Sequence, residues 1–284
     1  MINYKELFEK SKELASKSGL TQLELYQRFM FERILERISV SKYCNNFILK
    51  GGLLLSAMLG IESRSTRDMD VSIRGIDVAK EKMLEVLNEI LSIDIDDKVK
   101  FKVVNISDIR EDDEYGGNKY HLVGKLENLK VALEIDISTG DEITPRELNY
   151  EYKSLFENKK IYIDSYNIET ILAEKIETIL RRGKYNARMK DYYDIYFFLS
   201  KLNDKINVDI FRQALENTVM QRESSEYLKD YNKILGELLI NDRIHKNWNS
   251  YSNKNKYAKN LDFNDIVNLL MEFLNDNVKI LIFN

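Results

Sequence analysis

The chain has very little of the residues that build disulfides, thiolate metal sites and histidine-based catalytic centres. Its 284 residues include one cysteine, Cys44, and two histidines, His121 and His245, which lie far apart in the sequence. A single cysteine excludes an internal disulfide and a cysteine-based zinc site. The scarcity of histidine disfavours histidine-based triads and metal sites, so both histidines are expected to be structural. The GxxxxGK[ST] sequence of P-loop proteins is also absent.

Long apolar runs and an excess of positive charge are absent too. No run approaches the roughly 18 apolar residues that a membrane-spanning helix needs, and the charged N-terminus does not resemble a signal peptide. The sequence is 44% hydrophobic and 32% charged, as expected of a globular protein. The formal net charge of −4 disfavours a protein that is basic overall, so any contact with nucleic acid must come from a local patch. A cytoplasmic protein without a membrane partner is expected.

The chain divides into two parts of different character near residue 165. Residues 1–165 mix helical and strand patterns, whereas residues 166–284 are helical almost to the end. The sequence therefore predicts an α+β fold, in which a mixed β-sheet flanked by helices is followed by an α-helical bundle domain. In the first part the predicted helices are 4–17, 21–39, 53–59 and 77–91, the last capped by Asp77, and the predicted strands are 47–50, 67–73, 99–106, 119–125, 129–138 and 160–163, the last at a sheet edge. In the second part the predicted helices are 167–182, 187–201, 207–219, 224–247 and 262–276.

Two segments are expected to be irregular. The only proline, Pro145, is predicted to lie in a loop. Residues 246–260 are rich in Asn and Lys, with Trp248, Tyr251 and Tyr257 interleaved. This pattern predicts a long, exposed connection. Its aromatic side chains could stack on unpaired bases, although a plain flexible loop is the commoner meaning of such a segment.

The segment 47–71 carries the clearest chemical signal. A short apolar run leads into the glycine pair Gly51 and Gly52, and a helix-like stretch follows before Asp68 and Asp70. The two aspartates point to the same face of a strand, and such a carboxylate pair suits a hard divalent cation. A glycine turn at a helix start offers bare N–H groups to a phosphate. Singly, a glycine pair usually marks a turn and an Asp-x-Asp a solvated strand end; in this order they indicate nucleotidyl transfer.

A third carboxylate is expected on the strand predicted at 129–138. Its residues alternate strictly, so one face is apolar and the other carries Glu134 and Asp136. An ordinary half-buried strand would look the same. A polymerase-type site, however, needs a third carboxylate beside the Asp-x-Asp strand, to bridge the metal and help deprotonate the attacking hydroxyl. Asp136 is the candidate, with Glu134 as the alternative.

The strongest basic patch lies in residues 173–199. Lys175 is a candidate for stabilising the triphosphate as a point charge, and the other cations are candidates for binding a nucleic-acid backbone. Asp191 and Asp194 lie three residues apart on one helical face, where Asp191 could orient Lys175 or the base. A solvated helix pair with internal salt bridges is the plain alternative. The candidate RNA-binding residues are Arg181, Arg182, Lys184, Arg188 and Lys190.

These motifs, in this order, look like those of the AbiEii/AbiGii nucleotidyltransferase toxin family. The resemblance covers roughly residues 47–199, and the combination is more specific than any single motif. It implies a fold like that of DNA polymerase β-type nucleotidyltransferases, NTP as substrate, and Mg²⁺ or Mn²⁺. It also implies a toxin of a toxin–antitoxin or phage-defence system that modifies the 3′ end of tRNA and has an antitoxin encoded beside it. The matching residues are Lys50-Gly51-Gly52, Arg64-x-Thr66-x-Asp68-x-Asp70, Ile135-Asp136-Ile137, Ala173-Glu174-Lys175 and Lys190-Asp191-x-x-Asp194.

The resemblance also implies roles for individual residues. Asp68 and Asp70, with Asp136, would be the metal ligands and catalytic carboxylates, and Asp191 the acid of the helical motif. The nucleotide-binding residues would be Lys50, Gly51, Gly52, Leu53, Thr66 and Lys175. One departure is notable, because many relatives have Ser or Thr where this chain has Leu53, so a hydroxyl that would contact the β- or γ-phosphate is missing.

Other functions remain open from the residues. A nucleotidyltransferase that modifies a small molecule or a protein hydroxyl would share the carboxylates and the glycine pair but would not need the basic patch. A non-catalytic protein that sequesters nucleotide or RNA would bind NTP without releasing pyrophosphate. A structural scaffold is the plainest possibility. The sequence does not specify the base preference of the enzyme.

Overall fold

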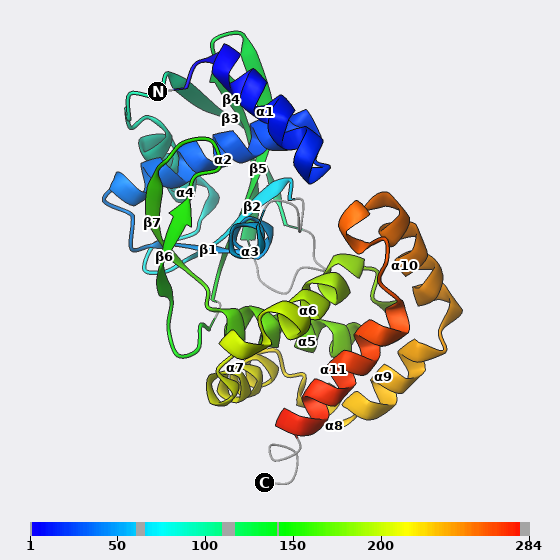
Figure 1. The fold of residues 1–284 in the computed structure, drawn as a ribbon. Coiled ribbons are helices and arrows are strands. Elements are labelled where there is room, and N and C mark those ends of the chain that lie inside the picture. Colours follow the sequence, from blue (N-terminus) through cyan, green and yellow to red (C-terminus); the bar gives the residue numbers. More distant parts are fainter. Residues whose placement is uncertain (1, 61–65, 110–116, 141, 279–284) are drawn as a thin grey trace. The chain divides into compact units, whose positions relative to one another are not determined.

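The computed structural model describes residues 2–60, 66–109, 117–140 and 142–278 (Figure 1). Arg64 and most of the turn expected at 111–118 lie outside these residues. The chain forms two compact units: residues 1–141 with 147–166, and residues 142–146 with 167–284. The short segment 142–146, expected in the first part, belongs to the second unit. Its backbone is hydrogen-bonded to that unit, because Asn167 donates from Nδ2 to the Thr144 carbonyl at 2.7 Å.

The first unit is built on one mixed seven-stranded sheet, and this confirms the predicted fold class. The strand order is β3-β4-β5-β2-β1-β7-β6. Strand β2 pairs parallel to β5 and antiparallel to β1, whereas β3, β4 and β5 form an antiparallel meander. The strands are β1 (Phe47–Lys50), β2 (Asp68–Ile73), β3 (Val99–Asp108), β4 (Gly117–Leu126), β5 (Leu129–Thr139), β6 (Leu148–Lys153) and β7 (Lys160–Ser165).

The end of the sheet formed by β7 and β6 differs from the prediction. The strand predicted at 160–163 is not at an edge, because β7 lies between β1 and β6. Strand β6 was not predicted from the sequence. Its residues show little apolar alternation, and of the six only Tyr152 is buried, so the period-2 signal of a half-buried strand is missing.

Helices pack on the apolar face of the sheet. These helices are α2 (Gln22–Val40) and α4 (Lys80–Leu91), which contact β5 and β3 respectively. On the other face of the β3–β4–β5 meander, which we call the open face, the described residues include the exposed side chains of Lys100, Lys125 and Lys130. Helix α2 is buried around most of its circumference, and Arg37 on it forms a bidentate ion pair with Asp97 at 2.7 and 2.8 Å. Helices α1 (Tyr4–Ser18) and α3 (Gly51–Leu59) complete the unit. Asp77 is not an N-cap, because α4 begins three residues later and Asp77 instead accepts from the Ala79 N–H at 2.9 Å.

The second unit is helical, as predicted, but its later part is more divided than expected. The helix predicted at 224–247 is three helices, and the Asn241 side chain caps the last of them by accepting from the Ile244 N–H at 3.1 Å. Within the described residues, no helix has both the length and the apolar character needed to cross a membrane. The helices are α5 (Ile168–Arg182), α6 (Met189–Lys201), α7 (Val208–Gln221), α8 (Ser225–Lys229), α9 (Tyr231–Leu239), α10 (Asp242–Lys254) and α11 (Phe263–Asn277).

The prediction of a long, exposed connection at 246–260 is wrong. Helix α10 continues to Lys254, and Trp248 is 2% exposed with its Nε1 donating to the Leu261 carbonyl at 3.0 Å. Tyr251 and Tyr257 lie within hydrogen-bonding distance of each other through their hydroxyls, at 3.1 Å. The aromatic residues therefore build the helical core here, and Trp248 does not offer its ring to an unpaired base.

Candidate active site

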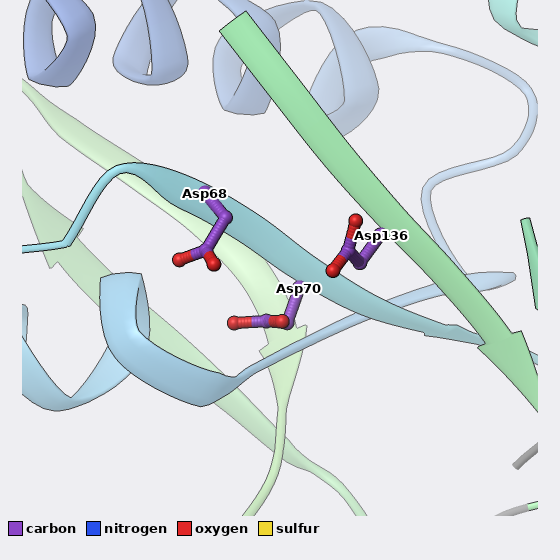
Figure 2. A group of neighbouring side chains, drawn as sticks. All are labelled: Asp68, Asp70 and Asp136. Carbon is purple, nitrogen blue, oxygen red and sulfur yellow. The ribbon is translucent and has the colours of Figure 1, made fainter. Parts of the chain in front are cut away.

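Three carboxylates of the first unit lie close together. Asp68 and Asp70 extend from β2, and Asp136 extends from the neighbouring β5 (Figure 2). One oxygen from each side chain can be chosen so that all three lie within 4.8 Å of one another, and each residue is half-buried. Such a cluster of hard oxygen ligands suits a divalent cation. We call these three residues the acidic triad.

The strand pairing brings the triad together. In the parallel β2–β5 ladder, Asp70 is the direct neighbour of Asp136 and Asp68 is the neighbour of Glu134. Directly paired residues place their side chains on the same face of a sheet. Of the two carboxylates considered for the third position, Asp136 is the one that joins the cluster. Thr66 fixes one member, since its hydroxyl donates to the Asp68 carboxylate at 2.9 Å.

The glycine pair lies against the triad, at the start of α3. Gly51 has φ of +63°, and a Cβ added there would lie 1.9 Å from Oδ2 of Asp70. The Gly52 N–H donates to that same oxygen at 3.2 Å. The Gly52 N–H, predicted to bind phosphate, therefore donates instead to Asp70, a predicted metal ligand. Leu53 is fully buried, and Lys50 lies with its Nζ 5.6 Å from the centre of the Tyr166 ring.

A lysine that sequence reasoning missed borders the triad. Lys119 on β4 lies 3.1 Å from Asp136 and 3.0 Å from Glu134, measured from its Nζ to their carboxylate oxygens. Burial alone would lower the pKa of Lys119, but the two carboxylates outweigh it and raise the pKa. The strand predicted at 119–125 begins with this lysine, but only the register with β5 shows that it faces Asp136.

The negative charges of the triad repel one another, and we call this repulsion the electrostatic strain of the metal-free site. Burial raises the pKa of Asp136 to about 6, and the negative charge of Asp70 adds to the rise while Lys119 opposes it. Carboxylates that repel one another in a partly buried site favour either a proton or a cation. The three carboxylates therefore fit a divalent metal ion, whose positive charge would offset their mutual repulsion.

This strain predicts that Asp136→Asn stabilises the metal-free protein near neutral pH. The raised pKa means that protonated Asp136 contributes stability below its ordinary pKa of 3.8, and that this contribution is lost as the pH rises through about 6. In the presence of a chelator we expect the variant to melt a few degrees above wild type at about pH 7.5, with no gain at about pH 4. Glu134→Gln, which removes the other partner of Lys119, is the matched control, and an equal gain from it would contradict the account.

A second charged cluster lies within the second unit. Nζ of Lys175 on α5 lies 2.7 Å from Asp191 and 2.8 Å from Asp194, both on α6. Arg188 also pairs with Asp191, from Nε at 3.0 Å. Burial by itself would raise the pKa of Asp191, but the charges of Lys175 and Arg188 hold it well below its usual range. The predicted contact between Lys175 and Asp191 is therefore present, with Asp194 as a second partner.

The basic residues predicted to bind RNA differ in their surroundings. Arg181 pairs with Glu177 one helical turn earlier, at 2.9 Å, and Glu177 is buried and also pairs with Arg222, at 2.5 Å. Arg182 is half-buried, and Arg188 is held by Asp191 as described above. Lys184 and Lys190 are exposed. The two lysines are thus the most accessible members of the patch.

Comparison with known proteins gives the family. The family model described as "Nucleotidyl transferase AbiEii toxin, Type IV TA system" matches residues 33–269. The chain belongs to this family. AbiEii membership makes it a nucleotidyltransferase and a toxin of a type IV toxin–antitoxin system, with an NTP substrate and an antitoxin as partner. A search of curated proteins gave no significant match.

Solved structures similar to this one include two from Helicobacter pylori. One, described as a candidate nucleotidyltransferase, is 16% identical, with 90% of this AbiEii chain and 98% of the other covered and a TM-score of 0.49. The second, JHP933, is 15% identical, with 92% and 97% covered and a TM-score of 0.49.

Proposed function

We propose that this toxin transfers a nucleotidyl group from an NTP, bound with Mg²⁺, to the 3′ end of tRNA in the cytoplasm. The observation that carries the proposal is the acidic triad beside the glycine-initiated helix α3. Carboxylates for a metal and N–H groups for a phosphate then lie at one place in the first unit. We further propose that the antitoxin is encoded beside the toxin.

The triad would hold the divalent cation through Asp68, Asp70 and Asp136. When bound, the cation would stabilise the negative charge that develops on the phosphate oxygens and on the departing pyrophosphate. Mn²⁺ has the same ligand preferences and could replace Mg²⁺. The hydrogen bonds from Thr66 to Asp68 and from Gly52 to Asp70 hold two of the ligands in place.

The remaining roles follow from the chemistry of phosphoryl transfer. The N–H groups of Gly51 and Leu53 at the start of α3 are proposed to bind the triphosphate. The acceptor hydroxyl attacks the α-phosphorus as the bond to pyrophosphate breaks, and its proton passes to Asp136.

Lys175 is proposed to bind the triphosphate as a compact positive charge. Asp191 and Asp194 fix the position of its ammonium group through ion pairs at 2.7 and 2.8 Å. In this proposal Asp191 is a positioning residue, acting through Lys175.

The exposed part of the basic patch allows a test of RNA binding. Lys184→Glu combined with Lys190→Glu is expected to raise the KM for tRNA about 10-fold, because two contacts to phosphate are reversed in charge. The matched control reverses Lys201 and Lys205, which are exposed in the same unit. Steady-state transfer to tRNA at fixed NTP gives both KM values. An enzyme that modifies a small molecule would lose nothing with either variant.

The experiment that tests the proposed function uses purified protein, total tRNA, Mg²⁺ and each labelled NTP in turn. Label entering tRNA with wild type and lost with Asp68→Ala supports the proposal and gives the base preference. Transfer to a small molecule or a protein instead of tRNA would contradict the proposed acceptor. Binding of NTP without release of pyrophosphate would contradict catalysis.

A further inference from the structure

The open face of the β3–β4–β5 meander carries a row of lysines. Lys100 on β3 pairs in register with Lys125 on β4, and Lys125 pairs with Lys130 on β5. All three side chains are exposed. Adjacent strands lie about 4.8 Å apart, so three positive charges stand side by side across the sheet. We call these three residues the lysine row.

The lysine row shares its face with the acidic triad. Side chains two residues apart point to the same face of a strand, so along β5 the open face carries Lys130, Ala132, Glu134 and Asp136. The alternate residues of β5 between them are buried. Six residues of strand span about 20 Å, a distance that several nucleotides of RNA can bridge.

The charges of the row are not balanced within the described part of the chain. There, Lys100, Lys125 and Lys130 form no ion pair and no side-chain hydrogen bond. Like charges directly opposite one another destabilise a sheet. Lysines do protect edge strands from unwanted pairing, and this explains Lys100 and Lys102 on the edge strand β3. It does not explain Lys125 or Lys130, which lie on inner strands.

We propose that the lysine row binds the phosphate backbone of the RNA acceptor and directs its end along β5 to Asp136. This inference rests on the proposed function and adds a binding surface to it. The occupant is a polyanion, because the row has positive charge and pairs with no acidic side chain among the described residues. Between row and triad, the described residues of this face include no Phe, Tyr or Trp. The His121 imidazole lies there, but its two ring nitrogens contact Ser107 and Glu134, at 3.0 and 3.4 Å, so we expect phosphate contacts rather than base stacking to dominate. Recognition is therefore expected to be independent of base sequence.

The test is the affinity of the protein for a short single-stranded RNA, measured by fluorescence anisotropy without NTP. Lys125→Glu combined with Lys130→Glu is expected to weaken binding about 10-fold or more, and to lower the slope of log affinity against log salt by about 1 for each lysine. Lys125→Gln with Lys130→Gln should give a smaller loss in the same direction. Lys153→Glu, an exposed lysine on the opposite edge strand β6, is the matched control and should bind as wild type does.

The outcomes separate this inference from the proposed function. Unchanged RNA affinity in the double variant, or an equal loss in the Lys153→Glu control, overturns the lysine row even if wild type modifies tRNA. Row-dependent binding by a protein that transfers no nucleotide to RNA supports the surface and contradicts the proposed function. Affinity of the double variant for Mn²⁺, followed by electron paramagnetic resonance, should match wild type. A folded variant that loses Mn²⁺ instead of RNA would also overturn the inference.

Discussion

Asp70→Asn is expected to lower the rate of nucleotidyl transfer by about 10²–10³-fold or more, because it removes a charged ligand from the acidic triad. Asp70 is the central member, since it is the direct neighbour of Asp136 on the next strand and accepts the Gly52 N–H. The asparagine oxygen can still accept that hydrogen bond. The start of α3 should therefore be preserved, and the loss should appear in kcat rather than in folding.

The measurement for Asp70→Asn is single-turnover transfer of labelled nucleotide, together with thermal melting. Glu134→Gln is the matched control, because Glu134 is a nearby carboxylate on the same face that does not belong to the triad. It is expected to keep most of the activity. An Asp70→Asn protein as active as the Glu134→Gln control would show that Asp70 does not support catalysis.

Gly51→Ala is expected to have the second large effect, with nearly complete loss of transfer. A Cβ at this position would lie 1.9 Å from Oδ2 of Asp70, so the carboxylate must move out of the triad. The backbone adds a second cost, because the φ of +63° is disfavoured by about 1–2 kcal/mol for a residue with a side chain. Activity and stability should both fall.

Gly140→Ala separates the two causes. Gly140 also has a positive φ, +87°, but an added Cβ there would have no atom of the described residues within 4 Å. This control should lose stability to a similar degree and keep its activity. Equal losses of transfer in both variants would mean that backbone strain, and not displacement of Asp70, is responsible. Transfer rates and chemical denaturation of both proteins provide the comparison.

The local parts of the site could be predicted from the sequence, because they depend on residues close together in the chain. The pattern of Gly51, Gly52, Asp68 and Asp70 is contained in one strand–helix–strand unit, and its order indicates both the carboxylates and the phosphate loop. The choice of Asp136 over Glu134 needed the third-carboxylate argument. That choice follows in the structure from the register of β2 against β5.

The parts that could not be predicted depend on pairing between distant segments. Lys119 faces Asp136 only because β4 and β5 pair in one particular register, and the lysine row arises in the same way. Trp248 looked exposed because Asn and Lys surround it, but the period of α10 turns it inward, where it is 2% exposed. Local composition thus gave the wrong environment for Trp248.

The most direct test of the central claim is a crystal structure with Mn²⁺ and a non-hydrolysable NTP analogue, with the metal located by its anomalous scattering. The account predicts an anomalous peak coordinated by the carboxylates of Asp68, Asp70 and Asp136, with the triphosphate against Gly51 and Leu53. Metal–oxygen distances of about 2.0–2.3 Å would identify direct coordination. A fully bound nucleotide and metal located elsewhere, with no density between the three carboxylates, would contradict it.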